Sequence, residues 1–227
     1  MSDPQTEVFR WNTPESRFAL LGVPEWGKDY SFASFPGTVP PEVLAWAAER
    51  EPRGLILYGA GSRGKTGLGI SILRSLVTPT PLPGERLEQW NMMTIPLLPG
   101  ASMEGITPDY IGAPCHFVQW DRVLEKYRRE RFDQTAWFDG LNTDIDVLMI
   151  DDVSAEKVSA YKESFLLRHI EWPFEKKGRA LILTMNTHPS KWPDVFGDRT
   201  TARLLNPKWF LAYEVKGTGL RTGSRNG

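Results

Sequence analysis

The residues best suited to chemistry stand in one glycine-rich stretch, Gly59-Ala-Gly-Ser-Arg-Gly64-Lys65-Thr66. Its spacing matches the nucleotide-binding P-loop. Glycines let the backbone wrap closely around phosphate oxygens, and the freed N–H groups form an anion nest with the start of the next helix. Lys65 would carry a fixed charge to the β and γ phosphates, and the Thr66 hydroxyl would hold Mg²⁺. A glycine-rich turn that matches by accident is the alternative. We predict a nucleoside-triphosphate site formed by Gly59, Ala60, Gly61, Ser62, Arg63, Gly64, Lys65, Thr66 and Gly67.

A second group of polar side chains follows the apolar run Val147–Ile150, which ends in Asp151 and Asp152. Such a run is typical of a core strand that delivers carboxylates to the carboxyl edge of a parallel sheet, where the nucleotide lies in P-loop folds. We expect Asp151 to complete the Mg²⁺ site with Thr66, and Asp152 to orient the attacking water. A strand that ends in acids is weak by itself, but its position downstream of a P-loop strengthens the prediction.

Asn186 ends another apolar run, which begins at Arg179. It would lie at the same edge as Asp151 if the two strands are neighbours, and there it would sense the γ-phosphate. The alternative is an ordinary turn residue, because Thr187 and Pro189 follow it. The P-loop context favours the sensor.

Two arginines, Arg199 and Arg203, are four residues apart in a short predicted helix and therefore share one face. Arginine is the side chain that phosphoryl transfer uses as an electrophilic finger. Two arginines on a helix are commonplace, so the assignment depends on their position after the Asn186 strand. We predict a catalytic role for Asp152, Asn186, Arg199 and Arg203.

The elements that must position these residues alternate between strands and helices. Apolar runs predict strands over 55–58, 115–120, 146–152, 179–186 and 209–215. Apolar positions at helical spacing predict helices over 68–77, 122–131, 159–174 and 196–205. A further helix over 40–50 opens with proline and carries Val43, Leu44 and Ala47 on one face, and Asp121 would cap the helix 122–131. The sequence predicts an α/β P-loop NTPase fold with a central parallel sheet flanked by helices.

Charge limits the partners that the chain can attract. The 227 residues carry a formal net charge of −1, so contact with nucleic acid would need a local patch. The densest basic cluster lies on the outer face of the helix 122–131, at Lys126, Arg128, Arg129 and Arg131. Because Glu125 and Glu130 are interleaved, a salt-paired solvent face is the alternative.

Cysteine usage and apolar segments exclude several classes. Cys115 is the single cysteine, which excludes an internal disulfide and a cysteine-based zinc site; we expect a small buried residue. The amino terminus lacks a basic region followed by an apolar run, and no apolar stretch reaches transmembrane length. We therefore expect no membrane segment and a cytoplasmic location.

The segment 78–114 holds most of the proline clusters of the chain. A long irregular segment inside a compact domain is uncommon and tends to be functional or disordered. It would be either an excursion that contacts a partner or a DNA strand, or an insertion packed on the domain surface.

The order of these motifs resembles the AAA+ ATPases of the DnaC-type helicase loaders and their IstB-type transposition-helper relatives, over roughly residues 18–221. Gly59–Thr66 corresponds to Walker A, 148–152 to Walker B with a paired Asp-Asp, and 183–186 to the sensor 1 strand end. The turn 21–24, with Phe32 and Phe35, resembles the family's Gly-Ile-Pro and Phe-x-x-Phe motifs, which lie near the adenine. Residues 197–204 resemble Gly-Glu-Arg…Ser-Arg-Leu, and 217–221 the closing Gly-x-x-x-Arg.

The resemblance implies ATP and Mg²⁺ as cofactors and a homo-oligomer in the ATP state, in which Arg199 completes the neighbour's site. It implies a DNA replication protein that loads or remodels a replicative helicase on single-stranded DNA. The implied organisation is a short arm and lead-in helix over 1–50, an ATPase domain over 51–216 without a full C-terminal lid, and a glycine-rich tail over 217–227. The sequence departs from the family in the 78–114 insertion, in Pro173-Phe174 where an Arg-Tyr pair is usual, and in the short arm, which leaves little chain for docking a helicase.

Three alternatives stay open. A transposition helper would share the ATP-site motifs. A monomeric P-loop kinase would need a lid and an acceptor pocket, and would give Arg199 no role in a neighbouring subunit. A nucleotide-gated adaptor with negligible turnover is the third, because the Asp152 side chain is shorter than glutamate.

Overall fold

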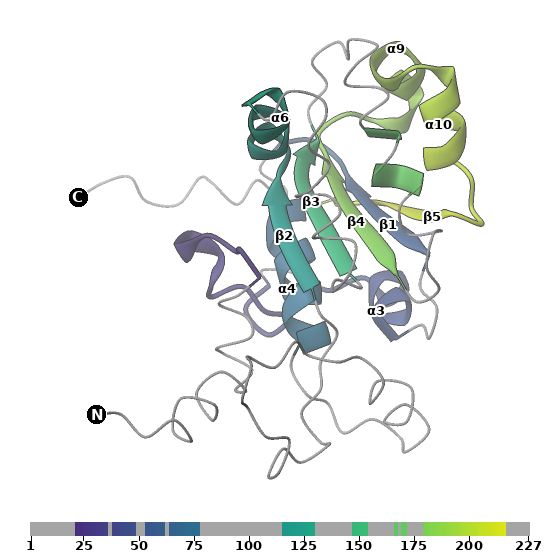
Figure 1. Ribbon diagram of the computed structural model, residues 1–227. Coiled ribbons are helices and arrows are strands. Elements are labelled where there is room, and N and C mark those ends of the chain that lie inside the picture. Colours follow the sequence, from purple (N-terminus) through teal and green to yellow (C-terminus); the bar gives the residue numbers. More distant parts are fainter. Residues whose placement is uncertain are drawn as a thin grey trace, which may run out of the picture.

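Five parallel strands form a sheet in the order β2-β3-β4-β1-β5, and all of them end at the same edge (Figure 1). The strands are β1 (Gly54–Tyr58), β2 (Cys115–Gln119), β3 (Val147–Val153), β4 (Ala180–Met185) and β5 (Phe210–Glu214). Strand β4 separates the P-loop strand β1 from the acidic strand β3. The predicted α/β fold is confirmed, and each predicted strand is present within a few residues of its expected bounds.

The computed structural model describes residues 21–35, 38–48, 53–61, 64–77, 115–129, 147–153, 166–167, 169–171 and 179–216, without the side chains of 126–129. The predictions for the arm before residue 21, for the 78–114 insertion and for the 217–227 tail lie outside these residues.

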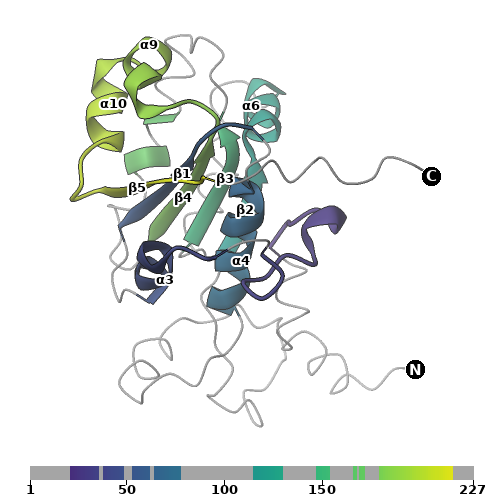
Figure 2. The same cartoon turned by 180° about the vertical axis from the view of Figure 1, so that it is seen from behind.

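Two apolar layers cover the two faces of the sheet, because successive strand residues point to opposite sides. On one side, Leu55 and Leu57 pack in a core with α4 (Lys65–Val77) and α3 (Pro41–Ala48). On the other side, Ile56 packs in a core with α6 (Trp120–Arg129), α9 (Trp192–Phe196) and α10 (Asp198–Leu204). Figures 1 and 2 show α4 running along its face of the sheet from the carboxyl edge of the strands. None of the helices described is long and apolar enough to cross a bilayer.

The packing of α3 corrects one prediction. Leu44, expected on the buried face, is 44% exposed, whereas Trp46 is buried. The indole Nε1 of Trp46 donates to the Arg53 carbonyl oxygen at 2.5 Å, which satisfies its polar atom and lets the large ring enter the core. The face of α3 is therefore rotated toward the tryptophan.

Two helix boundaries also differ from the prediction. Trp120 opens α6 rather than ending β2, so Asp121 lies in the first turn and is not the cap. Gly197, with φ 77°, divides the single helix expected over 196–205 into α9 and α10, because that backbone conformation interrupts a right-handed helix.

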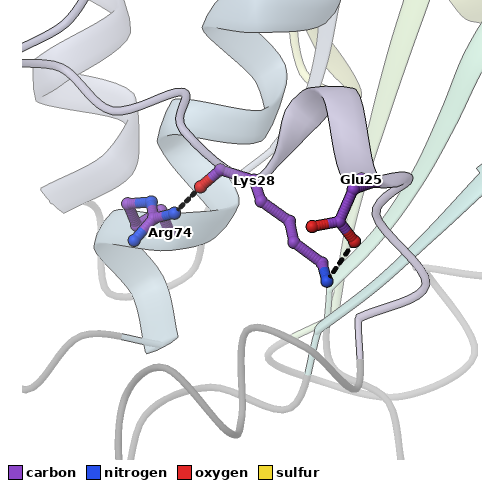
Figure 3. A network of polar contacts seen from close by, with 3 residues as sticks. All are labelled: Glu25, Lys28 and Arg74. Atoms are coloured by element: carbon purple, nitrogen blue, oxygen red, sulfur yellow. Dashed lines mark hydrogen bonds and ion pairs between the residues drawn. The ribbon is translucent and has the colours of Figure 1, made fainter.

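Residues 21–35, which we call the leading segment, contact both β2 and α4. The Phe117 amide of β2 donates to the Leu21 carbonyl at 2.6 Å. A 3-10 turn, η1 (Glu25–Gly27), follows, and Arg74 of α4 donates to the carbonyl oxygens of Lys28 and, at 2.9 Å, Tyr30. Figure 3 shows Arg74 reaching the Lys28 carbonyl while the Lys28 ammonium pairs with Glu25. Hydrogen bonds to its backbone carbonyl oxygens, from the Phe117 amide and from the Arg74 side chain, thus attach the segment to both elements.

Candidate nucleotide-binding site

The P-loop connects β1 to α4 and has the conformation that its glycines allow. Gly59 and Gly64 have φ values of 141° and 86°, which side chains with a Cβ rarely adopt. Lys65 is buried, and its Nζ donates to the carbonyl oxygens of Gly59 at 2.9 Å and Ala60 at 2.8 Å. The ammonium is thus held inside the loop by acceptors that phosphate oxygens could replace. Ser62 and Arg63 of the predicted set lie outside the described residues.

The other two glycines of the set differ in what surrounds them. A Cβ on Gly61 would meet nothing within 4 Å, so the backbone borders open space there. A Cβ on Gly67 would lie 2.8 Å from the Tyr30 ring. Packing against the leading segment therefore accounts for glycine at 67, whereas no described neighbour requires glycine at 61.

The predicted metal ligands come together across the sheet. The Thr66 hydroxyl, in the first turn of α4, donates to Asp151 Oδ1 on β3 at 2.8 Å. Asp151 is buried, and burial raises the pKa of its carboxyl group, although hydrogen bonds from Thr184 and Thr66 act in the opposite direction. The groups offered to a cation are a carboxylate and a hydroxyl oxygen, which suit Mg²⁺.

The residues fit a metal ion that is held together with a nucleotide. No group of three or more His, Cys, Asp or Glu side chains gathers among the described residues in a way that could hold a metal alone. Mg²⁺ commonly keeps several waters and binds through one or two carboxylates and the substrate phosphates. Thr66 and Asp151 would supply the protein's share.

Asp152 and Asn186 also meet, as the pairing of β3 with β4 requires. Asn186 Nδ2 donates to Asp152 Oδ1 at 2.6 Å, and both residues are exposed. Asp152 has a positive φ of 55°. The predicted water-orienting acid and the predicted γ-phosphate sensor are therefore neighbours at the carboxyl edge of the sheet.

The two arginines of α10 have different surroundings. Arg199 is exposed. Arg203 forms an ion pair with Glu171 at 2.7 Å, donates to the Arg199 carbonyl at 3.4 Å, and lies 5.6 Å from the centre of the Trp209 ring. Arg203 thus contacts residues of its own chain, whereas Arg199 is exposed to solvent. Of the basic cluster, Lys126, Arg128 and Arg129 lie in α6 with undescribed side chains, and Arg131 lies outside the described residues.

One polar residue of the site, Thr184, lies in the stretch 183–186 but was not predicted to be a site residue. Thr184 of β4 is buried, and its hydroxyl donates to Asp151 Oδ1 at 2.7 Å and accepts from the Asp152 amide at 2.8 Å. Its signal in the sequence is a single hydroxyl within the apolar run that ends at Asn186.

A P-loop between β1 and α4, with acids at the end of β3 and a polar residue just past β4, is the arrangement of the α/β P-loop NTPase fold. No protein-family model matches the chain, and no curated protein matches it. The solved structure of the DnaC helicase loader is similar at a TM-score of 0.60 and 11% identity, over 85% of this chain and 100% of that one. DnaI is similar at 0.57 and 18%, over 90% and 100%. The replication initiator DnaA bound to AMPPCP and single-stranded DNA is similar at 0.51 and 15%, over 83% and 50%. The likeness establishes the fold that the resemblance implied.

Proposed function

We propose that this chain is an ATP-binding and ATP-hydrolysing AAA+ protein of DNA replication that loads or remodels a replicative helicase on single-stranded DNA. The observation that carries the proposal is the 2.8 Å hydrogen bond between Thr66 and Asp151, which brings the two halves of the site together. The shared fold adds support, because one of the similar structures is a helicase loader and another holds AMPPCP and single-stranded DNA.

Each residue then has a defined task. Lys65 exchanges the loop carbonyls for the β and γ phosphate oxygens, and Thr66 and Asp151 hold Mg²⁺, which neutralises charge on those phosphates. The exposed carboxylate of Asp152 orients the attacking water, and the Asn186 amide contacts the γ-phosphate. Arg199 completes the site of a neighbouring subunit.

Turnover by mixed variants tests the shared site. We would measure ATP hydrolysis, with single-stranded DNA present, by Lys65→Ala, by Arg199→Ala and by their one-to-one mixture. Each variant alone should be inactive, since an arginine finger contributes about 10³-fold or more, and the mixture should recover activity. Lys191→Ala, which removes an exposed cation outside the site, is the control and should hydrolyse like wild type. Turnover of Arg199→Ala at the wild-type rate would remove the finger and favour a monomeric P-loop enzyme.

Charge reversal tests the proposed DNA contact. Glutamate at Lys126, Arg128, Arg129 and Arg131 should weaken single-strand binding and reduce its dependence on salt. Glutamate at the exposed residues Lys191, Lys208 and Lys216 gives a control with a similar charge change elsewhere. Unchanged binding by the first set, or equal loss in both, would exclude the basic cluster at 126–131 as the contact.

A further inference from the structure

Strand β3 carries one residue more than β4 where the two strands reach the site. Ile150 pairs with Leu183, but the next pair is Val153 with Met185, so three steps along β3 match two along β4. The extra residue is accommodated where Asp152, alone among the described non-glycine residues, has a positive φ. This β-bulge in a parallel pair is uncommon, and bulges of this kind redirect a side chain next to active sites.

The hydroxyl of Thr184 occupies the irregular part of the ladder. It accepts from the Asp152 amide at 2.8 Å, which satisfies a backbone donor at the bulge. It donates to Asp151 Oδ1 at 2.7 Å, so its single proton goes to the carboxylate. A hydroxyl can donate and accept at the same time, and one side chain therefore fixes the backbone of one acid and the carboxylate of the other.

The carboxylates of Asp151 and Asp152 point to opposite sides of β3. Within β3, Asp152 is exposed between the buried residues Asp151 and Val153. Asp151 is directed inward to Thr66, and Asp152 outward to Asn186. A regular strand would also place successive side chains on opposite faces, but it would not need the left-handed backbone at Asp152.

We propose that Thr184 is a positioning residue of the nucleotide site, which holds Asp151 in place for Mg²⁺ and Asp152 in place for the attacking water. The inference rests on the proposed function. Thr184 is buried and acts through the two acids. One of its partners is the proposed Mg²⁺ ligand Asp151, and the other is the proposed water-orienting acid Asp152. Loss of the Thr184 hydroxyl should therefore impair metal binding and turnover together.

The test compares Thr184→Val with Thr184→Ser. Valine has nearly the same shape and removes the hydroxyl, whereas serine retains it. Binding of a fluorescent methylanthraniloyl-ATP is titrated with Mg²⁺ and repeated in EDTA, and kcat and KM are measured beside it. For Thr184→Val we expect the Mg²⁺ requirement to rise about tenfold and kcat to fall about 10- to 100-fold, the range for partners of metal ligands. Binding of the fluorescent ATP by Thr184→Val in EDTA should stay within about threefold of the wild-type affinity. Thr184→Ser should show Mg²⁺ affinity and kcat within about threefold of the wild-type values.

Thr201→Val is the matched control, because Thr201 is a buried threonine whose hydroxyl has no hydrogen-bond partner among the described residues. It should leave the Mg²⁺ requirement unchanged. If Thr184→Val does not fold, Thr184→Ala is used, whose smaller side chain admits a water. Wild-type Mg²⁺ affinity in a folded Thr184→Val or Thr184→Ala variant would overturn the inference while the proposed function stands. A wild-type chain that binds no nucleotide would overturn both.

Discussion

The carboxyl group of Asp151, the proposed Mg²⁺ ligand, lowers the stability of the ligand-free chain when it is ionised. It is buried beside the P-loop and receives hydrogen bonds from Thr66 and Thr184, yet burial dominates and raises its pKa. The folded chain therefore binds this proton more tightly than the unfolded chain. The stability associated with the protonated group is present at low pH and is lost as the pH rises from 3.8 through the raised pKa.

Asp151→Asn should consequently stabilise the ligand-free protein at neutral pH. Asparagine keeps an oxygen for the two hydroxyls and removes the buried charge. We expect a gain of about 1 kcal/mol, the size of a typical stabilising substitution, or about 2–4 °C in Tm, measured by thermal unfolding in EDTA. The same variant should lose Mg²⁺-dependent hydrolysis.

Asp152→Asn is the control for this prediction. Its side chain is exposed, so the unfolding temperature should change little, while hydrolysis should also fall under the proposed mechanism. A lower Tm for Asp151→Asn than for wild type would show that the ionised carboxylate stabilises the fold.

Among the elements, α4 joins the nucleotide site to the leading segment. Gly67 lies one residue after Thr66 and packs on the Tyr30 ring, and Gly27 approaches Ile70 on the same helix. Arg74 holds the segment two turns further along. The helix that carries the P-loop threonine therefore also carries the docking surface of residues 21–35.

Gly67→Ala tests this junction. Alanine is the better helix former by about 1 kcal/mol, but its Cβ would overlap the Tyr30 ring at 2.8 Å, and overpacking costs about 1–3 kcal/mol. We expect net destabilisation of about 1 kcal/mol and faster amide hydrogen exchange across residues 21–35. Gly61→Ala, which meets nothing within 4 Å, should change the unfolding free energy by less than about 0.5 kcal/mol. Unchanged exchange in Gly67→Ala would mean that Tyr30 moves aside freely.

The contact between β2 and the leading segment should be sensitive to acid. His116 is partly buried, with its ring beside Gly22, and burial lowers its pKa from 6.5. Stability due to the neutral ring is complete above pH 6.5 and is lost as the pH falls toward the lowered value. Between pH 7.5 and 5.5 this loss is at most about 1.4 kcal/mol, because the unfolded chain titrates at 6.5.

Urea unfolding at the two pH values, with wild type and His116→Gln, isolates this contribution from that of the carboxylates. The wild type should lose more stability than the variant on acidification. Equal losses would assign the acid sensitivity to other groups.

The sequence predicted the parts of the site that depend on short runs of residues. The apolar strands predicted over 55–58, 146–152 and 179–186 follow from local hydrophobicity, and the P-loop follows from glycine spacing. The β-bulge at Asp152 was not predictable in this way, because it depends on the register with β4 and on the Thr184 hydroxyl 32 positions away. The burial of Trp46 in place of Leu44 likewise depends on a tertiary acceptor, the Arg53 carbonyl.

At the scale of the whole molecule, Arg199 is the predicted residue of the site that a second copy of the chain could reach, because it is exposed. Arg203 is engaged with Glu171 and Trp209, whereas Arg199, one turn earlier, is exposed. An exposed arginine on α10 is available to a second copy of the chain, as the proposed shared site requires. Anything that binds only the assembled state shifts the equilibrium toward it, so a nucleotide shared between subunits should drive association.

Sedimentation velocity with AMPPCP and Mg²⁺ measures this coupling. Wild type should shift to a larger species when the nucleotide is added, and Lys65→Ala should not, because it loses the phosphate contact. Arg199→Ala should still bind the nucleotide through its own P-loop and yet associate more weakly, since its lost contact lies across the interface. Lys208→Ala, an exposed cation outside α10, should behave like wild type. If wild type binds AMPPCP without any change in sedimentation, the nucleotide is held within a single chain and Arg199 has no partner site to complete. The monomeric P-loop kinase would then be the better explanation of the same fold, and a search for its acceptor substrate would replace the search for a helicase.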